Sequence, residues 1–313
     1  MTEYVIETKN LTKKYKDKKV VNNIYMNVEK GKIYALLGKN GAGKTTTMRM
    51  LLNLATETSG EIMLFGSKPN NEAYKKIGAI IETPGFYENL TAEENLEIIA
   101  KIRGHYQKEK IKEILHTVSL DNSRKEYKNF SLGMKQRLGI AAAIMHEPEL
   151  LILDEPINGL DPIGIKEIRR LLKKMSKENN TTILISSHIL SEIENIADVI
   201  GVMDNGKLIT ELTKEELHEQ LNKNVEFEVS DIDKATTILE DMGLHKITDY
   251  NIVESNTIFL YTNINLIDKI NEIFVKNDIR VKKMNLNEEN LEEYFTRIIN
   301  PIELIAWKKE VII

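Results

Sequence analysis

Residues 38–46, which read GKNGAGKTT, have the types and spacing of a phosphate-binding loop. Gly38, Gly43, Lys44 and Thr45 follow the pattern G-x-x-x-x-G-K-[ST] between an apolar run and a helical pattern. Glycine lets the backbone curl so that successive N–H groups point at phosphate oxygens, and the positive end of the following helix favours an anion. We therefore expect Lys44 to reach the β- and γ-phosphates of a nucleotide and the Thr45 hydroxyl to bind Mg²⁺. The other expected loop residues are Lys39, Asn40, Gly41, Ala42 and Thr46.

A second candidate for chemistry is the acidic end of the apolar run LLILDE at 150–155. Asp154 and Glu155 would lie at the carboxyl end of a buried strand, where open α/β sheets bind their ligands. Asp154 can hold Mg²⁺ through water, and Glu155 can polarise the water that attacks a γ-phosphate. An acidic pair at a strand end is often only a cap or a solvated turn. The complete phosphate loop favours the chemical interpretation.

Composition limits the remaining choices of function. The chain has 313 residues, of which 42% are hydrophobic and 29% charged, and a net charge of −5. These values indicate a globular protein and argue against a generally basic nucleic-acid binder. The absence of cysteine excludes disulfides and thiolate metal sites and fits a reducing compartment. The N-terminus has no signal-peptide core, and no apolar run approaches the ~20 residues that span a bilayer, so we expect any membrane role to be peripheral.

The elements that must position these residues form two domains. Residues 1–222 alternate short apolar runs with helical patterns, which predicts an α/β domain with a largely parallel sheet. A charged helical lobe is expected at about 88–145. The clearest predicted strands are 32–38, 150–155 and 181–188.

Residues 223–313 are predicted to form a C-terminal ferredoxin-like α+β domain followed by a terminal helix. The boundary near residue 222 depends on the change of pattern alone. No motif in this domain indicates chemistry, so its phenylalanines, Phe227, Phe259, Phe274 and Phe295, are expected in the core. The predicted order is strand 225–230, helix 233–243, strands 245–250 and 257–262, helix 266–277, strand 279–286 and helix 287–300.

The order of the motifs is specific. The motifs follow one another along the chain in this order: a phosphate loop, a helical insert, the S-x-G-x-x-Q-R segment in NFSLGMKQRLG, an acidic strand and the strand ending ISSH. From about Tyr4 to Gly206, this arrangement resembles the ATP-binding subunit of ABC transporters. The resemblance implies a mostly parallel sheet with added antiparallel strands and a helical lobe. It also implies ATP and Mg²⁺ as cofactors, and ATP hydrolysis as the activity.

The resemblance also assigns roles to individual residues. Tyr15 matches the aromatic residue that stacks on adenine, and His188 matches the histidine that bonds the γ-phosphate. Ser131 and Gly133 match the signature loop, which contacts the ATP held by a partner subunit, and Asp161 matches a loop that connects the two ATP sites. The signature departs from the family's commonest form, L-S-G-G-Q, at three positions, which are Phe130, Leu132 and Met134.

One chain supplies half of each sandwiched site, so the resemblance implies a homodimer or a heterodimer with a paralogous ATPase. A single cassette without a membrane span is similar to transport ATPases that dock on separate integral-membrane permease subunits. We therefore expect a peripheral position on the cytoplasmic face of the cell membrane, reached through the permease, and no nucleic-acid partner.

Glu82 indicates a branch of the family. Most members have Gln at this position, where the side chain contacts Mg²⁺ and the attacking water. Glu82 followed by PGFY, together with the SLGMK signature and the C-terminal unit, is similar to the exporters of lantibiotic immunity and bacitracin resistance. An ionised carboxylate only accepts hydrogen bonds and repels a bare phosphate, so we expect Glu82 to face Mg²⁺ or the permease interface.

Three other functions remain open from the sequence. The chain could serve an exporter of another substrate, such as a lipid or a drug. A P-loop kinase would need the phosphate loop but not Ser131, Gly133 and His188, which count against it. A regulatory ATP-binding dimer without turnover would not need Glu155.

Overall fold

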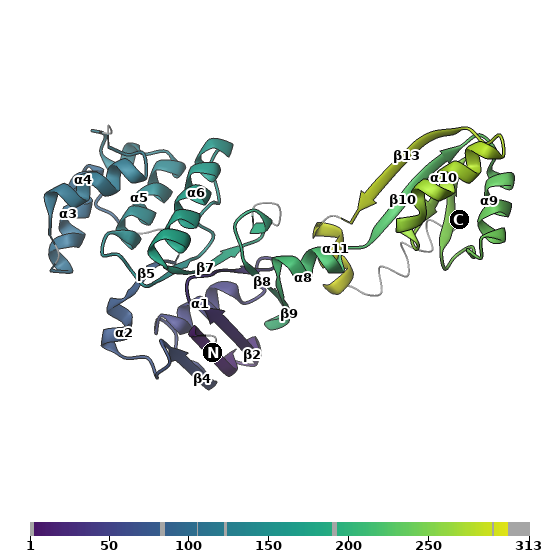
Figure 1. Cartoon of the computed structure of the whole chain (residues 1–313). Coiled ribbons are helices and arrows are strands. Elements are labelled where there is room, and N and C mark those ends of the chain that lie inside the picture. The colour runs from purple at the N-terminus through teal and green to yellow at the C-terminus, as the bar shows by residue number, and fades with distance from the viewer. Residues whose placement is uncertain are drawn as a thin grey trace. The chain divides into compact units, whose positions relative to one another are not determined.

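The computed structural model describes residues 3–81, 85–104, 106–121, 124–189, 193–289 and 291–299. The chain divides into two compact units, Met1–Glu215 and Glu216–Ile313 (Figure 1). The boundary expected from the sequence lies a few residues further along, near residue 222. The described residues form two sheets in the first unit and one in the second, and each unit has its own hydrophobic core.

A six-stranded sheet forms the centre of the first unit. Its order is β5-β6-β7-β3-β8-β9, and all neighbours are parallel except β8 and β9. The residues of β3, β6 and β7 are all buried, which explains why these strands are continuous apolar runs and confirms the strands predicted there. The bounds are β3 Ile33–Leu37, β5 Ile77–Ile80, β6 Leu150–Leu153, β7 Thr182–Ser187, β8 Val199–Asp204 and β9 Lys207–Thr213.

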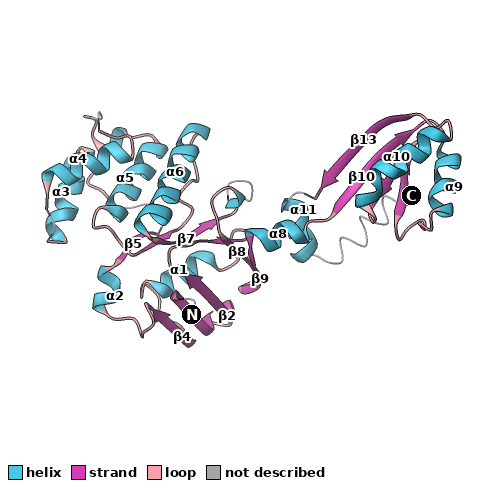
Figure 2. Cartoon of the chain, viewed as in Figure 1, coloured by secondary structure: helices cyan, strands magenta, loops and turns pink. Residues whose placement is uncertain are grey.

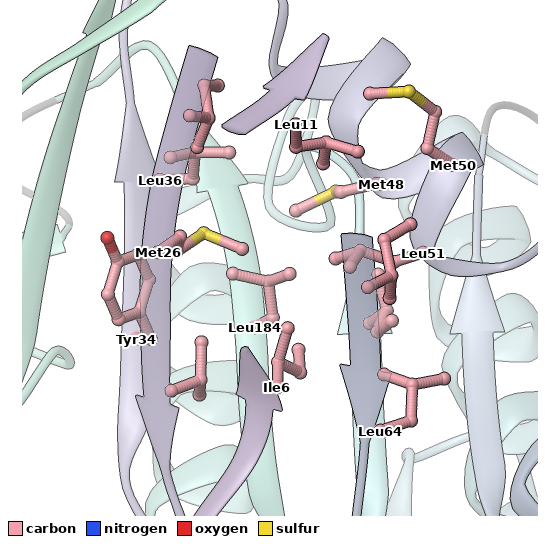
Figure 3. Packing of buried hydrophobic residues seen from close by; sticks show 14 of the residues in the cluster. Ile6, Leu11, Met26, Tyr34, Leu36, Met48, Met50, Leu51, Leu64 and Leu184 are labelled. Carbon is pink, nitrogen blue, oxygen red and sulfur yellow. The ribbon is translucent and has the colours of Figure 1, made fainter. Parts of the chain in front are cut away.

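An antiparallel sheet of order β2-β1-β4 completes the core of this unit. Its strands are β1 Tyr4–Tyr15, β2 Lys18–Glu29 and β4 Ser59–Leu64. Side chains of these strands pack with those of α1, Lys44–Leu51, and of the central sheet. Met48 of α1 belongs to one buried cluster with Leu11 of β1 and with Leu36 and Leu184 of the central sheet (Figure 3). The helix that follows the phosphate loop is therefore fixed by buried contacts.

The helices of the first unit include α3, α4 and α5, which lie within the lobe expected at about 88–145 (Figure 1). Thr91 begins α3 with a capping box, because its side chain accepts from the Glu94 backbone while the Glu94 carboxylate accepts from the Thr91 N–H. The bounds are α2 Asn71–Lys75, α3 Ala92–Ile102, α4 Lys108–Thr117, the 3₁₀ turn η1 Tyr127–Asn129, α5 Leu132–Ile144 and α6 Pro162–Asn179. Within the described ranges, every helix is too short or too polar to cross a bilayer.

The second unit contains an antiparallel sheet of order β11-β12-β10-β13 (Figure 2). Two helices, α9 and α10, contribute buried residues to one core with this sheet. The order β-α-β-β-α-β is the order of a ferredoxin-like unit. The bounds are α8 Lys214–Gln220, β10 Lys223–Val229, α9 Ile232–Asp241, β11 Tyr250–Glu254, β12 Thr257–Leu260, η2 Ile264–Leu266, α10 Ile267–Lys276, β13 Val281–Glu288 and α11 Leu291–Ile299.

The strand predicted at 245–250 is wrong, because β11 begins only at Tyr250. Asp249 instead closes a turn: its carboxylate accepts hydrogen bonds from the His245 backbone N–H and the Thr262 hydroxyl, both at 2.8 Å. Ile247 has a φ of 79°, which a strand does not allow. Local bonds from side chain to backbone therefore outweigh the alternating pattern.

The phenylalanines of the second unit lie largely where expected. Phe227, Phe274 and Phe295 are buried, but Phe259 is only half-buried, so its expected core position is wrong. The cross-strand neighbour of Phe259 is Glu226, and Phe259 therefore lies on the face of the sheet that the core does not cover.

Candidate nucleotide-binding site

The loop between β3 and α1 has the backbone form that the sequence predicted. Gly43 has a φ of 111°, and a Cβ there would lie 2.7 Å from the Val20 carbonyl oxygen. A Cβ on Gly38 would lie 2.3 Å from the Met203 carbonyl oxygen. Both positions therefore require glycine. Because the tight loop ends at the start of α1, its N–H groups and the helix end can face an anion together.

Lys44 lies across this loop and is only 5% exposed. Its ammonium group donates hydrogen bonds to the carbonyl oxygens of Gly38 at 2.5 Å and Lys39 at 3.3 Å. It also lies 3.5 Å from Oε1 of Glu155. The loop thus holds one buried positive charge beside a row of backbone groups.

Thr45 and Asp154 meet although they come from different elements. The Thr45 hydroxyl donates to Oδ2 of Asp154 at 2.7 Å. In the sheet, β7 lies between β3 and β6, so Ser186 at the end of β7 reaches the same carboxylate. Its hydroxyl donates to Oδ1 of Asp154 at 2.5 Å. Both oxygens of Asp154 are therefore fixed at the carboxyl edge of the sheet.

Glu155 lies next to this pair in an unusual backbone conformation. Its φ of 48° is in the left-handed region, which few non-glycine residues adopt. The Glu155 N–H donates to the Ser186 hydroxyl at 2.9 Å, and its carbonyl accepts from Nε2 of Gln136 at 3.4 Å. This conformation directs the carboxylate toward Lys44 and His188.

The two oxygens of the Glu155 carboxylate have different surroundings. Oε2 lies 2.8 Å from Nδ1 of His188, which directly follows β7. Oε1 is buried and lies within ion-pair distance of Lys44, yet no described group forms a hydrogen bond with it. Although the Lys44 ammonium lies 3.5 Å away, Oε1 keeps its capacity to accept a hydrogen bond. An acceptor of this kind, beside a phosphate loop, can orient a water molecule.

The signature segment begins a helix. The Ser131 hydroxyl caps α5 by accepting from the Met134 N–H at 3.3 Å. A Cβ on Gly133 would lie 3.2 Å from Leu160, and a Cβ on Gly159 would lie 2.2 Å from Leu132. The signature segment therefore packs closely on the loop that leads from Glu155 to α6.

Asp161 and Tyr15 make their contacts with other parts of the chain than Lys44 and Glu155. The Asp161 carboxylate caps α6 by accepting from the Gly164 N–H at 2.9 Å. Tyr15 is 47% exposed at the end of β1, with the Lys13 ammonium 4.8 Å from its ring centroid. In the part of the chain that the structure describes, neither side chain hydrogen-bonds to Lys44 or Glu155.

The structure thus brings Lys44, Thr45, Asp154, Glu155 and His188 together. Their catalytic and ligand-binding roles stay predictions. Glu82 lies outside the described residues.

Two residues of this site were not singled out from the sequence, Ser186 and Gln136. Ser186 is the first serine of ISSH and lies two residues before His188. Gln136 is the glutamine of the S-x-G-x-x-Q-R segment. Both residues belong to motifs that the sequence shows, but only the fold brings them into contact with residues 154–155.

The fold and this site define a P-loop nucleotide-binding protein. Comparison with known proteins gives the family. A family model described as "ABC transporter" matches residues 21–158. A second, described as an AAA domain and putative AbiEii toxin of a type IV toxin–antitoxin system, matches residues 126–194.

Relatives match over most of the chain. The bacitracin transport ATP-binding protein BcrA of Enterococcus faecalis is 56% identical over 95% of this chain and 97% of its own length. The lantibiotic transport ATP-binding protein SrtF of Streptococcus pyogenes is 46% identical over 72% of this chain and 99% of its own. A solved structure described as a dimeric bacterial ABC transporter cassette has a TM-score of 0.61 and 25% identity, and covers 67% of this chain and 98% of that one. This chain belongs to the ATP-binding proteins of ABC transporters, a family of ATPases.

Proposed function

We propose that this chain hydrolyses ATP to power the removal of a membrane-active peptide antibiotic, of the bacitracin or lantibiotic type, through separate permease subunits. The observation that carries the proposal is the 56% identity to a bacitracin transport ATP-binding protein over 95% of the chain. A match of that extent includes most of the C-terminal unit. The lantibiotic relative is matched over nearly its whole length by 72% of this chain. The bacitracin type is therefore favoured.

The phosphate loop would bind the phosphates of ATP, and Thr45 and Asp154 would bind Mg²⁺. Backbone N–H groups of residues 38–46 and the Lys44 ammonium would hold the β- and γ-phosphates. The Thr45 hydroxyl and the Asp154 carboxylate supply hard oxygens, 2.7 Å apart, that suit Mg²⁺. The described residues contain no group of three or more His, Asp or Glu able to hold a metal ion. The pair of Thr45 and Asp154 nevertheless fits Mg²⁺, because this ion is commonly bound by one or two carboxylates together with substrate phosphates.

Glu155 would act as the base in hydrolysis. Its buried Oε1 can accept a hydrogen bond from the attacking water, and its Oε2 is held by His188 at 2.8 Å. His188 would in turn contact the γ-phosphate. When bound, Mg²⁺ would neutralise charge on the phosphates.

The site would be completed by a second subunit. Ser131 and Gly133 make no hydrogen bond to the loop of their own chain in the described ranges, and Ser131 is exposed at a helix start that can face an anion. We infer that they contact the ATP held by a partner, either a second copy or a paralogous ATPase. The dimeric cassette to which the chain is similar supports this arrangement. The permease would hold the dimer at the cytoplasmic face of the membrane, with no nucleic acid involved.

Growth of a susceptible bacterium tests the proposal. A host that lacks such transporters would express the chain together with its permease subunits, and growth would be followed in bacitracin and in a nisin-type lantibiotic. We expect higher resistance with the wild type than with Glu155→Gln, and a larger gain for bacitracin. Equal sensitivity of both strains to both peptides, with both proteins present at equal levels, would contradict peptide removal and favour another substrate.

A further inference from the structure

β13 forms one edge of the sheet in the C-terminal unit (Figure 2). Among the described residues it pairs with β10 alone. It is eight residues long, whereas β11 and β12 have five and four residues. A long edge strand presents a row of unpaired N–H and C=O groups, which is a template for a further strand.

The face of β13 that continues the core is exposed in the part of the chain that the structure describes. Met284 and Leu286 lie opposite Phe227 and Val225 of β10, so all four point to the same face of the sheet. Phe227 and Val225 are 1% and 0% exposed, but Met284 and Leu286 are 45% and 54% exposed. The apolar surface therefore extends from the core to the edge of the sheet.

The lysines of this edge do not protect it from pairing. Edge strands are commonly kept single by free lysines, whose charge repels a second strand. Here Lys283 forms an ion pair with Glu226 at 2.7 Å, and Lys282 forms one with Glu228 at 3.3 Å. Both charges are thus balanced by β10.

We propose that β13 pairs antiparallel with β13 of a second copy of this chain, with Asn285 opposite Asn285. This contact is additional to the sandwich of ATP between cassettes and does not depend on it. In this register Met284 lies opposite Leu286 of the second copy, and Lys283 lies opposite Asn287. Each contact occurs twice, because a two-fold axis passes through the pair of Asn285 residues.

The apolar pattern selects this register. Centring the pair on Met284 would place Lys282 opposite Leu286, and centring it on Leu286 would place Met284 opposite Glu288. Both alternatives set a charged side chain against an apolar one. The register at Asn285 instead places Met284 and Leu286 of the two copies opposite each other, apolar against apolar.

A single cysteine tests the pairing in the full-length protein without nucleotide. The chain has no cysteine, so Asn285→Cys introduces the sole thiol. Directly opposed residues of antiparallel strands lie about 4.5–5.5 Å apart at Cα, within the range of a disulfide. We expect mild oxidation to give several-fold more disulfide-linked dimer for Asn285→Cys than for Lys269→Cys, an exposed control on α10.

The same method tests the register and the apolar contact. Lys283→Cys alone should not cross-link, since its counterpart would lie about 13 Å away, four residues along the strand. The double variant Lys283→Cys/Asn287→Cys should cross-link, because these positions oppose each other. Adding Met284→Lys and Leu286→Lys to Asn285→Cys should lower the yield of dimer, with an unchanged melting temperature showing that the fold is intact.

Two results would overturn the proposal. If Asn285→Cys forms no more dimer than the Lys269→Cys control, β13 does not pair with a second copy. If Lys283→Cys alone cross-links as well as Asn285→Cys, the strands do not pair in this register. Neither result bears on ATP hydrolysis, which is measured separately.

Discussion

At the scale of single residues, Ser186 connects the Asp154 carboxylate to the backbone of Glu155. Its hydroxyl donates to Asp154 at 2.5 Å and accepts from the Glu155 N–H at 2.9 Å. Ser186 is fully buried, so water cannot replace it. The Asp154 carboxylate and the Glu155 backbone therefore both depend on one buried hydroxyl.

Replacing Ser186 with alanine should lower both stability and turnover. Leaving buried groups without a partner costs about 1–3 kcal/mol of the free energy of unfolding. The rate of phosphate release should fall as well, because Asp154 and Glu155 lose their positions. Denaturant unfolding and an ATPase assay measure the two effects.

Ser176→Ala is the matched control. Ser176 is buried on α6 and donates to the Gly31 carbonyl at 2.7 Å, away from the site. This variant should lose comparable stability but keep its turnover. An equal loss of turnover in both variants would mean that Ser186 acts through stability alone.

Glu82 provides a prediction that rests on the sequence. If its carboxylate faces Mg²⁺ or the permease, Glu82→Gln removes a negative charge and adds a hydrogen-bond donor there. We expect a changed ATPase rate or changed peptide resistance, measured beside Glu88→Gln as a surface control. Wild-type values for both properties would show that the position has no special role.

At the scale of elements, the turn at residues 245–249 depends on an ionised side chain. The pKa of Asp249 is lowered, mainly by the hydrogen bond from the His245 N–H and then by the bond from Thr262. A carboxyl group with a lowered pKa in the folded state stabilises the protein above its unfolded pKa of about 3.9, and this stabilisation is lost as the pH falls through the folded value.

Asp249→Asn should therefore have a pH-dependent effect. The difference in melting temperature between wild type and variant should be constant above about pH 5 and shrink below about pH 4. Asp241→Asn, at an exposed position at the end of α9, is the control for a general effect of charge. A difference that stays the same down to pH 3 would contradict the role of the carboxylate in this turn.

The elements also show which features the sequence could predict. The phosphate loop and the acidic strand are local patterns, and the structure places them between the expected strands and helix. The bond from Ser186 to Asp154 joins residues 32 positions apart, and a serine within an apolar strand carries no local sign of it. The turn at 245–249 was missed for a different reason, because bonds of Asp249 override an alternating pattern that is typical of a strand.

At the scale of the whole molecule, the proposed function requires that two chains share each ATP, with the exposed Ser131 of one chain facing the nucleotide held at Lys44 of the other. Light scattering on Glu155→Gln at low protein concentration should show a larger dimer fraction when ATP is added, since we expect this variant to bind ATP and to cleave it slowly. Ser131→Arg in this background should abolish the increase, and Thr237→Arg, on the exposed side of α9, should not. An increase that survives Ser131→Arg would exclude the signature segment from the shared site.

The most direct test of the account is the rate of phosphate release by the chain reconstituted with its permease in lipid vesicles, with and without bacitracin. We expect bacitracin to raise the rate of the wild type, and Glu155→Gln to lower it by about 10²–10⁴-fold, the usual contribution of a general base. Unchanged release by Glu155→Gln would contradict the assigned chemistry, and a wild-type rate indifferent to the peptide would contradict its coupling to peptide removal.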